Sequence, residues 1–407
     1  MATPESIVIV GAGQAGYWGA QALRKQGFGG RLTLVGSEPH PPYERPPLSK
    51  QVLKGEAEPP SAWLTTPEKL AEMQVEFLSG RTAIAIDRPG RRVELQDGAR
   101  IGYDRLLLTT GSRPRRLDLP GERAAPVFYL RDIADALALR ERLAAGQRLL
   151  VIGGGLIGLE VAAAAVARGC VVTVIEVADR LMARMVGPGI SAHFANLHRA
   201  RGTEILTGRI PERFEPSGSG CRVICRDGSS CDGDLAVIGC GVIPNAELAA
   251  AAGLKVENGL WVDVYCRTDD PHIWAAGDVT NHAHPLLGRR LRLETWQNAQ
   301  NQAIAAARNM VSDPQPYADV PWGWSDQLGA NLQVLGVPGS FEPAVTRGDP
   351  ANGSFTLFYL EGDKIAGVNA VNAPKDIAVA RRLMAGNLSV DPGRLRDPAV
   401  PLRSLLT

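Results

Sequence analysis

The chain has 407 residues, which predicts two or three domains, each large enough to bury its own core. Its 45% hydrophobic and 21% charged residues exclude a disordered or fibrous protein. The formal net charge of +1 provides no overall attraction to nucleic acid or membrane, so we expect neither partner. Six cysteines without a C-x-x-C pair are typical of a reducing, cytoplasmic protein, and we expect no metal site.

The first predicted unit begins with a short β-branched strand over residues 6–10. The strand leads into a G-x-G-x-x-G motif, formed by Gly11, Gly13 and Gly16, and then into a stretch compatible with a helix. A second apolar strand over 31–35 is followed by Glu38. In this arrangement the glycines admit a pyrophosphate to a positive helix N-terminus, and the acid accepts hydrogen bonds from a ribose. The pattern therefore predicts a dinucleotide site.

A proline-rich loop over residues 41–50 follows this first acid. Its four prolines stiffen the backbone, so the loop presents Arg45 and Lys50 at fixed positions beside the first dinucleotide. The alternative is a solvated basic surface loop with no ligand.

The same pattern recurs in a second predicted unit. A strand over 148–152 leads into three spaced glycines, which are Gly153, Gly155 and Gly158. A strand over 171–175 then ends at Glu176. One such motif is a weak signal, but strand, glycines, helix and acid in the same order twice favour two dinucleotide sites. A flavin and a nicotinamide cofactor are the pair that would exchange a hydride.

The two units also share their far ends. Residues 93–114 match residues 223–244 at a constant offset, and each segment has an Asp-Gly turn between alternating strands. We expect a small antiparallel meander and a buried returning strand in each unit. The repeat therefore occupies approximately residues 1–240.

Two later segments also resemble parts of a cofactor site. Gly277 and Asp278 follow an apolar strand, where the aspartate either reaches a ligand or caps the next segment. Residues 294–310 predict a helix whose first turn contains Trp296 and Gln297, and its half-positive N-terminus would stabilise a reduced flavin. Trp296 and Trp324 are alternatively ordinary core residues.

These residues resemble the FAD-dependent pyridine-nucleotide reductases, and among them the putidaredoxin reductase-like ferredoxin reductases of Rieske dioxygenase and P450 systems. The motifs that carry the resemblance are PYERPPLSK at 42–50, TTGSRP at 109–114, WAAGDV at 274–279, ETWQN at 294–298 and WSDQ at 324–327. The resemblance covers nearly the whole chain. It implies an α/β fold with two Rossmann-like dinucleotide-binding domains and a small α+β C-terminal domain.

The resemblance also implies domain boundaries, cofactors and site residues. The FAD-binding domain would comprise 1–112 and 240–318, the NAD-binding domain 113–239, and the C-terminal interface domain 319–407. FAD would occupy the first unit and NADH the second. The implied cofactor-binding residues are Gly11, Gly13, Gly16, Glu38, Arg45, Lys50, Thr110, Gly111, Arg131, Gly153, Gly155, Gly158, Glu160, Glu176, Gly277, Asp278, Trp296, Gln297 and Trp324.

The position of the cysteines indicates the electron acceptor. Disulfide reductases of this architecture keep a cysteine pair soon after the first fingerprint, whereas the first cysteine here is Cys170. Electrons must then leave the flavin to an outside partner or to oxygen, and the resemblance implies a [2Fe-2S] ferredoxin that takes them one at a time. Arg289, Arg290 and Arg292 are the candidate docking patch, or else a solvated loop. The remaining alternatives are an NADH oxidase or quinone-type reductase and an NADH-responsive interaction flavoprotein.

Two further expectations concern individual side chains. Lys50 and Glu160 are predicted to form an ion pair beside the flavin and to act in catalysis, although Glu160 is alternatively an acid favoured by its helix dipole. Glu176 should favour NADH over NADPH, because a carboxylate repels a 2′-phosphate. Arg180 and Arg184 follow closely and could hold such a phosphate.

Overall fold

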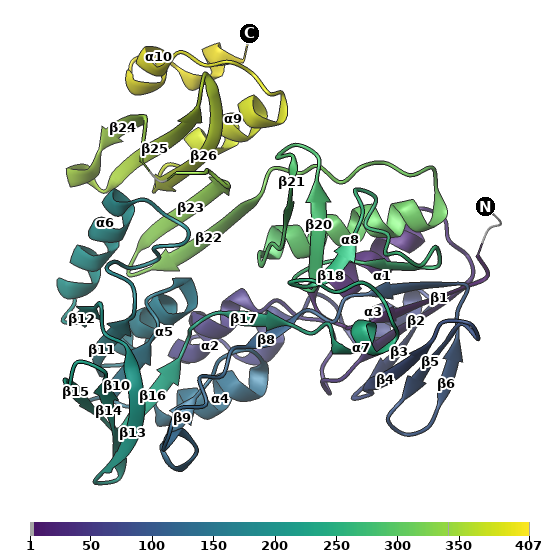
Figure 1. The fold of residues 1–407 in the computed structure, drawn as a ribbon, viewed down its shortest axis with the longest axis horizontal. Helices are drawn as coiled ribbons and strands as arrows, with labels where there is room; N and C mark the ends of the chain where they lie inside the picture. Colours follow the sequence, from purple (N-terminus) through teal and green to yellow (C-terminus); the bar gives the residue numbers. More distant parts are fainter. Residues whose placement is uncertain (1–3, 341, 407) are drawn as a thin grey trace. The chain divides into compact units, whose positions relative to one another are not determined.

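A computed structural model describes residues 4–340 and 342–406, and the chain forms two compact units (Figure 1). The first unit contains the chain through Glu44 together with 60–113 and 243–321. The second contains 45–59, 114–242 and the chain from Trp322 onward. The C-terminal segment thus groups with the second nucleotide-binding module, and the division into three domains stays a prediction.

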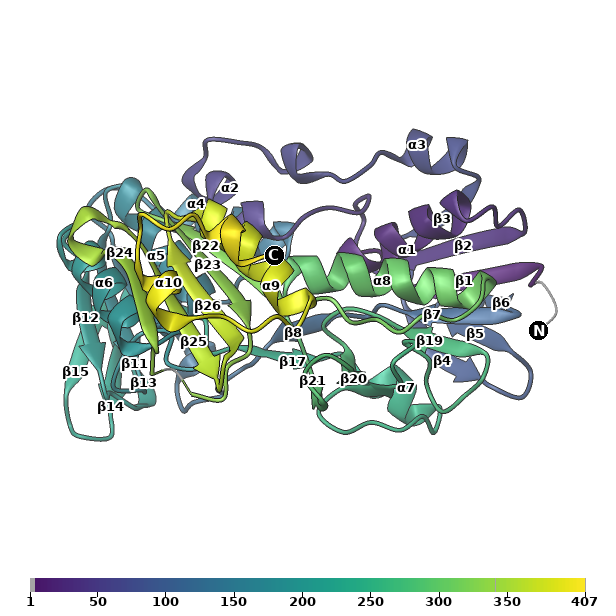
Figure 2. The ribbon, with the colours of Figure 1, turned by 90° about the horizontal axis from the view of Figure 1, so that it is seen from above.

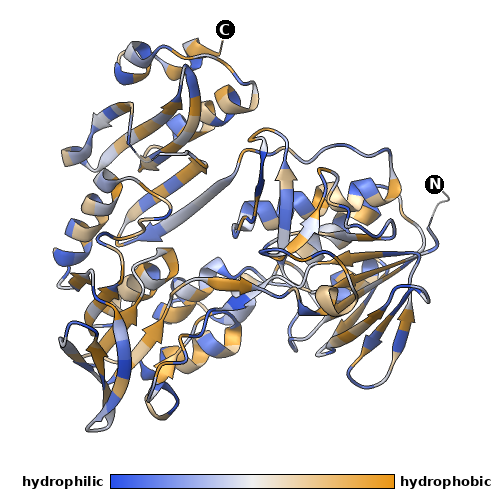
Figure 3. Ribbon diagram, in the orientation of Figure 1, coloured by the Kyte–Doolittle hydropathy of each residue, from blue (hydrophilic) through white to orange (hydrophobic). Residues whose placement is uncertain are grey.

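The first unit is built on a five-stranded parallel sheet in the order β19-β7-β1-β2-β3. The strands are β1 (Ser6–Val10), β2 (Arg31–Gly36), β3 (Val75–Ser79), β7 (Arg105–Leu108) and β19 (Ile273–Ala275). Helices α1 (Gln14–Lys25) and α8 (Trp296–Val311) pack against each other beside this sheet (Figure 2). Buried aliphatic side chains of β1, β2 and β7 form the core, and these strands are coloured as hydrophobic in Figure 3.

Smaller elements complete the first unit. An antiparallel meander contains β4 (Ala83–Asp87), β5 (Arg92–Leu95) and β6 (Arg100–Gly102), and a second three-stranded sheet contains β18 (Leu260–Val262), β20 (Thr280–His284) and β21 (Arg289–Leu291). The short helices are α3 (Pro67–Glu72) and α7 (Glu247–Ala251). The chain passes from one unit to the other within β8 (Ser112–Pro114) and β17 (Val242–Pro244).

The second unit repeats this plan. Its parallel sheet has the order β12-β11-β10-β16-β9, and its strands are β9 (Val127–Phe128), β10 (Arg148–Ile152), β11 (Val171–Glu176), β12 (Glu204–Thr207) and β16 (Leu235–Ile238). The helices are α2 (Gln51–Lys54), α4 (Ile133–Arg142), α5 (Leu156–Ala167) and α6 (Pro188–Arg199). The predicted meander contains β13 (Pro211–Ser217), β14 (Gly220–Cys225) and β15 (Ser230–Gly233).

The C-terminal segment adds a five-stranded antiparallel sheet to the second unit, in the order β22-β23-β26-β25-β24. Its strands are β22 (Trp322–Gln327), β23 (Ala330–Gly336), β24 (Val345–Asp349), β25 (Ser354–Glu361) and β26 (Lys364–Val371), followed by α9 (Pro374–Ala385) and α10 (Pro392–Arg396). Strand β22 packs against α5 of the second nucleotide-binding module. The predicted fold class, two parallel dinucleotide-binding modules and a small α+β segment, is confirmed.

The structure refines one predicted boundary. The helix expected over 294–310 begins at Trp296, because Thr295 is its N-cap and accepts a hydrogen bond from the Asn298 amide. Glu294 therefore lies outside the helix. Trp296 and Gln297 still occupy the first turn, as the sequence predicts.

Candidate functional site

The first glycine motif forms a cradle between β1 and α1. A Cβ at Gly11 would lie 2.1 Å from the Thr109 carbonyl oxygen, and one at Gly16 would lie 1.9 Å from the Gly11 oxygen. A Cβ at Gly13 would meet nothing within 4 Å. The first and third glycines therefore serve close backbone packing, and the second leaves open space at the helix N-terminus. Gly13 is the N-cap of α1 and provides no side chain to bind the first-turn amides.

The second cradle, between β10 and α5, reproduces this division of roles. A Cβ at Gly153 would lie 2.5 Å from the Gly239 oxygen, and one at Gly158 would lie 2.1 Å from the Gly153 oxygen. A Cβ at Gly155 would again meet nothing within 4 Å. Both cradles thus keep a helix N-terminus open to an anionic group, as dinucleotide binding requires.

The two acids are held by different partners. The Glu38 carboxylate accepts a hydrogen bond of 2.5 Å from the hydroxyl of buried Tyr43. The Glu176 carboxylate accepts two backbone amides, Gly154 N at 2.6 Å and Ala178 N at 2.7 Å. Each carboxylate is therefore fixed in orientation. No sequence pattern predicts this contact of Tyr43, although the residue lies in the proline-rich motif.

The acids also occupy different positions relative to their strands. Val10 pairs with Val35 in the first sheet and Ile152 pairs with Ile175 in the second, so Glu176 corresponds to Gly36 rather than to Glu38. Gly36 is required there because its Cβ would lie 2.6 Å from the Ala12 Cβ.

In the second cradle this pair of residues is exchanged. Gly154 replaces alanine, and a Cβ there would lie 3.1 Å from a Glu176 carboxylate oxygen. In the second copy Gly154 faces Glu176, and in the first copy Gly36 faces Ala12. The exchange explains why Glu176 can sit on the strand itself while Glu38 follows two residues later.

The predicted residues around α8 and β19 lie together in the first unit. Ser112 donates a 2.7 Å hydrogen bond to Asp278, and Thr110 donates one to the Asn245 carbonyl oxygen. Asp278 is not a helix cap, because strand β20 follows it. Gly277 has φ of +83°, and its amide donates to Gln302 of α8. The loop after β19 is thereby tied to the helix.

Trp296 is anchored rather than loosely packed. Its indole N–H lies 3.1 Å from a carboxylate oxygen of Glu44, next to the proline-rich stretch. This contact places the first turn of α8 against the loop that follows Glu38 and Tyr43. Gln297, in the same turn, is buried.

In the second unit, Arg45 and Lys50 take different partners. The Arg45 guanidinium donates to the Arg131 carbonyl oxygen at 2.6 Å. The Arg131 amide in turn donates to Asp135 of α4, whose pKa is raised by burial and by the neighbouring Asp132 charge. Arg45 and Arg131, both predicted cofactor ligands, are therefore brought together.

The Lys50 ammonium lies 3.0 Å from the Glu160 carboxylate, as the sequence predicts for this pair. The same carboxylate accepts hydrogen bonds from the Ser49 hydroxyl at 2.5 Å and the Ser325 hydroxyl at 2.6 Å. Glu160 is 6% exposed. Its carboxylate is therefore buried with one opposite charge, and two hydroxyls donate hydrogen bonds to it. Both serines lie in motifs that carry the family resemblance, but no pattern in the sequence predicts their contact with Glu160.

Two tryptophans of β22 form a stacked pair, because alternate residues of a strand share a face. The Trp322 and Trp324 ring centroids are 5.2 Å apart with an interplanar angle of 19°. The Arg381 guanidinium lies 5.1 Å from the Trp322 centroid. Trp324 is half-buried and is thus neither a core residue nor fully solvated.

The three arginines predicted to dock a partner have unequal surroundings. Arg290 donates to the Val262 carbonyl oxygen and lies 3.6 Å from the Trp261 ring centroid. Arg292 forms an ion pair with Glu294, and its side chain is 16% exposed. Arg289 alone of the three has an exposed side chain. Two of these guanidinium groups are therefore used in packing the first unit.

Burial raises the pKa of most thiols. The pKa of Cys221 rises to about 11, and those of Cys170, Cys231, Cys240 and Cys266 also rise, with desolvation as the largest cause. Such thiols are protonated and unreactive at neutral pH. Within 4–340 and 342–406, no group of three His, Cys, Asp or Glu side chains is arranged to hold a metal ion.

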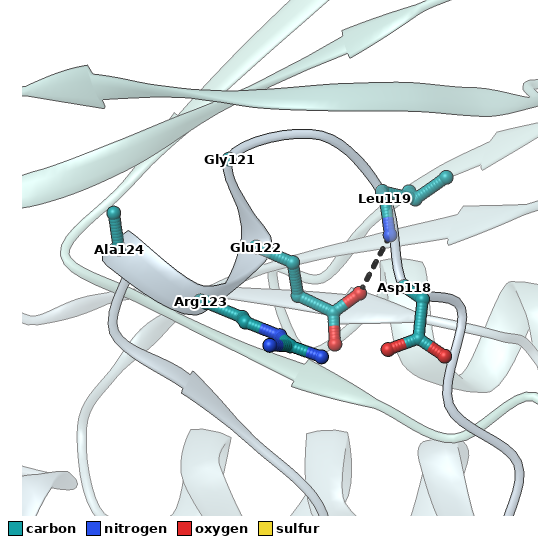
Figure 4. Close-up of a pocket in the computed structure, with 6 residues that line it drawn as sticks. All are labelled: Asp118, Leu119, Gly121, Glu122, Arg123 and Ala124. Atoms are coloured by element: carbon teal, nitrogen blue, oxygen red, sulfur yellow. Dashed lines mark hydrogen bonds between the residues drawn. The ribbon is translucent and has the colours of Figure 1, made fainter.

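A pocket of about 480 Å³ lies elsewhere in the second unit (Figure 4). The residues that line it are Asp118, Leu119, Gly121, Glu122, Arg123 and Ala124. Glu122 turns its carboxylate to the Leu119 amide and the Tyr129 hydroxyl, at 3.0 and 2.6 Å. The Glu122 carboxylate is therefore used in holding the turn, and no predicted site residue lines this pocket.

Among the helices of the described residues, none has an apolar stretch that could span a lipid bilayer.

Two cradles of this kind in one chain are the arrangement expected of an oxidoreductase with two dinucleotide sites. A family model described as pyridine nucleotide-disulphide oxidoreductase matches residues 5–303, and a model described as reductase C-terminal matches residues 322–406. The chain belongs to the pyridine nucleotide-disulphide oxidoreductase family.

Known relatives extend along the whole chain. The ferredoxin–NAD(+) reductase component of the anthranilate 1,2-dioxygenase system of Burkholderia cepacia is 43% identical over 403 residues, covering 99% of both chains. Putidaredoxin reductase of Pseudomonas putida is 38% identical over 408 residues, covering 99% of this chain and 97% of its own. The predicted resemblance to ferredoxin reductases of dioxygenase and P450 systems is confirmed.

Solved structures give the same result. The ferredoxin reductase for the CYP199A2 system from Rhodopseudomonas palustris has a TM-score of 0.96 and 38% identity, covering 99% of this chain and 100% of its own. The reductase in the covalent putidaredoxin reductase–putidaredoxin complex has a TM-score of 0.94 and 38% identity, covering 100% and 99%.

Proposed function

We propose that this protein is a ferredoxin–NAD(+) reductase, an FAD enzyme that oxidises NADH and passes electrons to a [2Fe-2S] ferredoxin of a dioxygenase or P450 system. The observation that carries the proposal is the pair of open glycine cradles, each with an oriented acid, in a chain 43% identical along 99% of its length to such a reductase component. A relative of 38% identity forms a covalent complex with putidaredoxin.

FAD fits the first cradle and NADH the second. The open space at Gly13 and Gly155 accommodates the two pyrophosphates, and Glu38 and Glu176 retain acceptor positions for ribose hydroxyls. When bound, FAD supplies the conversion of a two-electron donor to two one-electron transfers. The rest of the function is carried by the side chains that bind and orient these groups.

Three sets of side chains prepare the first unit for a flavin. Tyr43 orients Glu38, Ser112 orients Asp278, and the N-terminus of α8 places its half-positive charge at Trp296 and Gln297. A helix N-terminus aimed at the pyrimidine edge of a flavin would stabilise a negative charge there.

In the second unit, Lys50 and Glu160 form the ion pair at 3.0 Å. We assign Lys50 to the flavin edge and Glu160 to orientation of the nicotinamide carboxamide. Because the pair is largely buried, loss of either residue would leave the other charge without its partner.

The electrons leave this chain for a separate partner protein. No cysteine precedes Cys170, so no thiol pair follows the first cradle, and burial raises the pKa of the Cys170 and Cys221 thiols. Ferredoxins of this type are usually acidic, which favours a basic docking surface. Of the predicted patch, Arg289 is the residue whose exposure suits docking.

The test uses the FAD-loaded protein without oxygen. Titration with NADH should bleach the flavin absorbance at one equivalent, and addition of an oxidised [2Fe-2S] ferredoxin should restore it while the ferredoxin is reduced. Rapid oxidation by oxygen with no ferredoxin reduction would identify an oxidase instead. Slow bleaching and a long-lived reduced complex would identify an NADH-responsive interaction protein. Failure to bind FAD or to react with NADH would refute the proposal.

A further inference from the structure

The Glu160 carboxylate is the end of a longer chain of buried hydrogen bonds. Beyond Ser325, the Gln327 amide nitrogen lies 2.9 Å from the Ser325 hydroxyl oxygen. The Gln327 amide oxygen lies 3.1 Å from Nε2 of His198 on α6. The chain therefore joins α6, β22 and α5 within the second unit, through residues far apart in the sequence.

Water cannot replace these contacts easily. Ser325 and His198 are 0% exposed and Gln327 is 1% exposed. Each member is polar, so a break would leave a buried donor or acceptor without a partner. A buried polar network of this kind is costly for stability. It is useful where it fixes the orientation of a side chain that apolar packing would not orient.

The hydrogen bonds can run in one direction only. An ionised carboxylate can only accept, so the Ser325 hydroxyl donates to Glu160 and its oxygen accepts from the Gln327 amide N–H. The Gln327 carbonyl oxygen is thereby turned to His198, which must donate from Nε2. Burial lowers the pKa of His198, so the imidazole is neutral and keeps this one N–H. Every donor therefore points toward the Glu160 charge.

We propose that Ser325, Gln327 and His198 form a relay of positioning residues that holds the Glu160 carboxylate oriented toward Lys50 during flavin reduction by NADH. The inference rests on the proposed function and deepens it, because it assigns part of the NADH half-reaction to the C-terminal segment. None of the three need touch a cofactor. They act through Glu160.

The other charged groups near α5 are engaged elsewhere. Helix α5 packs against the 46–49 turn, α2, β10, β11 and β22. Lys50 is the charged group from these elements that pairs with Glu160. The remaining charged side chains have other contacts: Lys54 with Glu56, Arg148 with Asp234, Glu176 with the Gly154 amide and Asp326 with Trp324 and Asn331. Loss of the Ser325 hydroxyl should thus alter the Lys50–Glu160 ion pair before any other charged group near α5.

The experiment measures flavin reduction by saturating NADH in a stopped-flow instrument, without oxygen, from about pH 5.5 to pH 8.5. Removing a donor to a carboxylate favours its protonated form. Ser325→Ala should therefore move the acidic limb of the rate profile upward by about one pH unit, in line with one charge-assisted hydrogen bond. Gln327→Met should move it in the same direction by less, because Ser325 still contacts Glu160.

The matched control is Thr356→Val. Thr356 is also 0% exposed, lies in the same C-terminal sheet and donates its hydroxyl to a carboxylate, Asp376, at 2.8 Å. This variant loses a comparable buried hydrogen bond, so a purely structural effect would appear in it as well. Its pH profile should match that of the unmodified protein.

The outcomes separate the relay from the proposed function. If the unmodified protein is not reduced by NADH, the proposed function fails. If it is reduced and the profiles of Ser325→Ala and Gln327→Met superimpose on it, or if Thr356→Val shifts equally, the relay is wrong. Should Ser325→Ala fail to retain FAD, Gln327→Met alone decides, because it leaves every direct contact of Glu160 in place.

Discussion

Glu176 illustrates how single residues prepare this site. Its two oxygens are bound by the Gly154 and Ala178 amides, so the side chain cannot turn away from an incoming ribose. Arg180 is not available for a 2′-phosphate, because its guanidinium donates to the Val186 and Ala183 carbonyl oxygens. We therefore expect Glu176, whose position is fixed, to set the cofactor specificity.

We expect NADH to be preferred over NADPH, and Glu176→Ala to reduce the ratio of the two kcat/KM values by about tenfold, equal to about 1.4 kcal/mol. Steady-state kinetics with each cofactor measure this ratio. Glu204→Ala is the control, because Glu204 is an exposed acid on β12, next to β11, that accepts the Thr173 hydroxyl. Equal kcat/KM values in the unmodified enzyme would contradict the prediction.

The Lys50–Glu160 pair provides a second prediction for individual residues. Lys50→Ala and Glu160→Ala should each slow flavin reduction by NADH, because each leaves the other charge buried and unpaired. The double variant should lose much less than the sum of the two single losses. Stopped-flow rates at saturating NADH complete this cycle. Additive losses, or unchanged rates in both single variants, would show that the pair does not act as a unit.

At the scale of elements, the entry from strand to helix decides both folding and binding. In each cradle the third glycine is packed against backbone, whereas the second faces open space. The same three-glycine motif thus contains one position where a methyl group is excluded by the fold and one where it would meet only a ligand.

Gly155→Ala should fold normally, since φ of −80° suits alanine, but should raise the KM for NADH by obstructing the pyrophosphate. Gly158→Ala should destabilise the second unit by about 3 kcal/mol or more, because its Cβ would lie 2.1 Å from a backbone oxygen. Urea unfolding and NADH titration together measure the two effects. A stable Gly158→Ala protein with unchanged unfolding would contradict this assignment.

A partly buried ion pair joins the first meander to the segment before β19. Arg88, just after β4, donates to Asp270 at 2.7 Å and also to the Gly253 carbonyl oxygen. Burial tends to raise the pKa of Asp270, but the Arg88 hydrogen bond and charge outweigh it, so the net pKa is lowered. This contribution to stability is therefore present above the unfolded pKa of about 4 and is lost as pH falls through the lower folded value.

Asp270→Asn should lower the free energy of unfolding by about 1.5–3 kcal/mol at pH 7. The difference from the unmodified protein should shrink as the pH is lowered below about 4, because the aspartate itself is then protonated. Denaturant unfolding at several pH values measures this dependence. Asp232→Asn removes an exposed pair with Arg222 and should have a smaller effect at every pH. A difference that grew in acid would contradict the pairing.

At the scale of the whole molecule, we expect the thiols to support the packing of the fold and to take no part in electron transfer. Cys221, Cys225 and Cys266 are at most 2% exposed and pack as small hydrophobic groups. Replacement of all six cysteines by Ala or Ser should cost about 1 kcal/mol for each fully buried thiol. NADH-driven flavin reduction should survive with FAD bound. A single cysteine substitution that abolished reduction without loss of FAD would show that a thiol takes part.

The structure places the C-terminal segment with the second module, which bears on how the function is distributed. Sequence similarity alone assigned this segment as an interface for a partner. Because Ser325 donates to Glu160, we infer that the segment also contributes to the predicted catalytic pair. Its role for the partner stays a prediction.

The sequence by itself determined the fold class and the two cradles in their order, whereas the pairing of Lys50 with Glu160 was expected from the family resemblance and from the placement of both residues beside the cofactor motifs. The fold class and the cradles depend on short contiguous patterns, such as a β-branched strand followed by spaced glycines, whose local geometry differs little between proteins. The repeat strengthened them, because two copies must fold by the same rules.

Only the tertiary structure decided which groups surround those residues. Ser325 reaches Glu160 across 165 positions of the chain, and His198 reaches Gln327 across 129. The packing of Arg290 against Trp261 and the different strand positions of Glu38 and Glu176 are equally invisible in the sequence. Such contacts depend on how separate elements pack, and packing is set by the shapes of side chains throughout the core rather than by any local pattern.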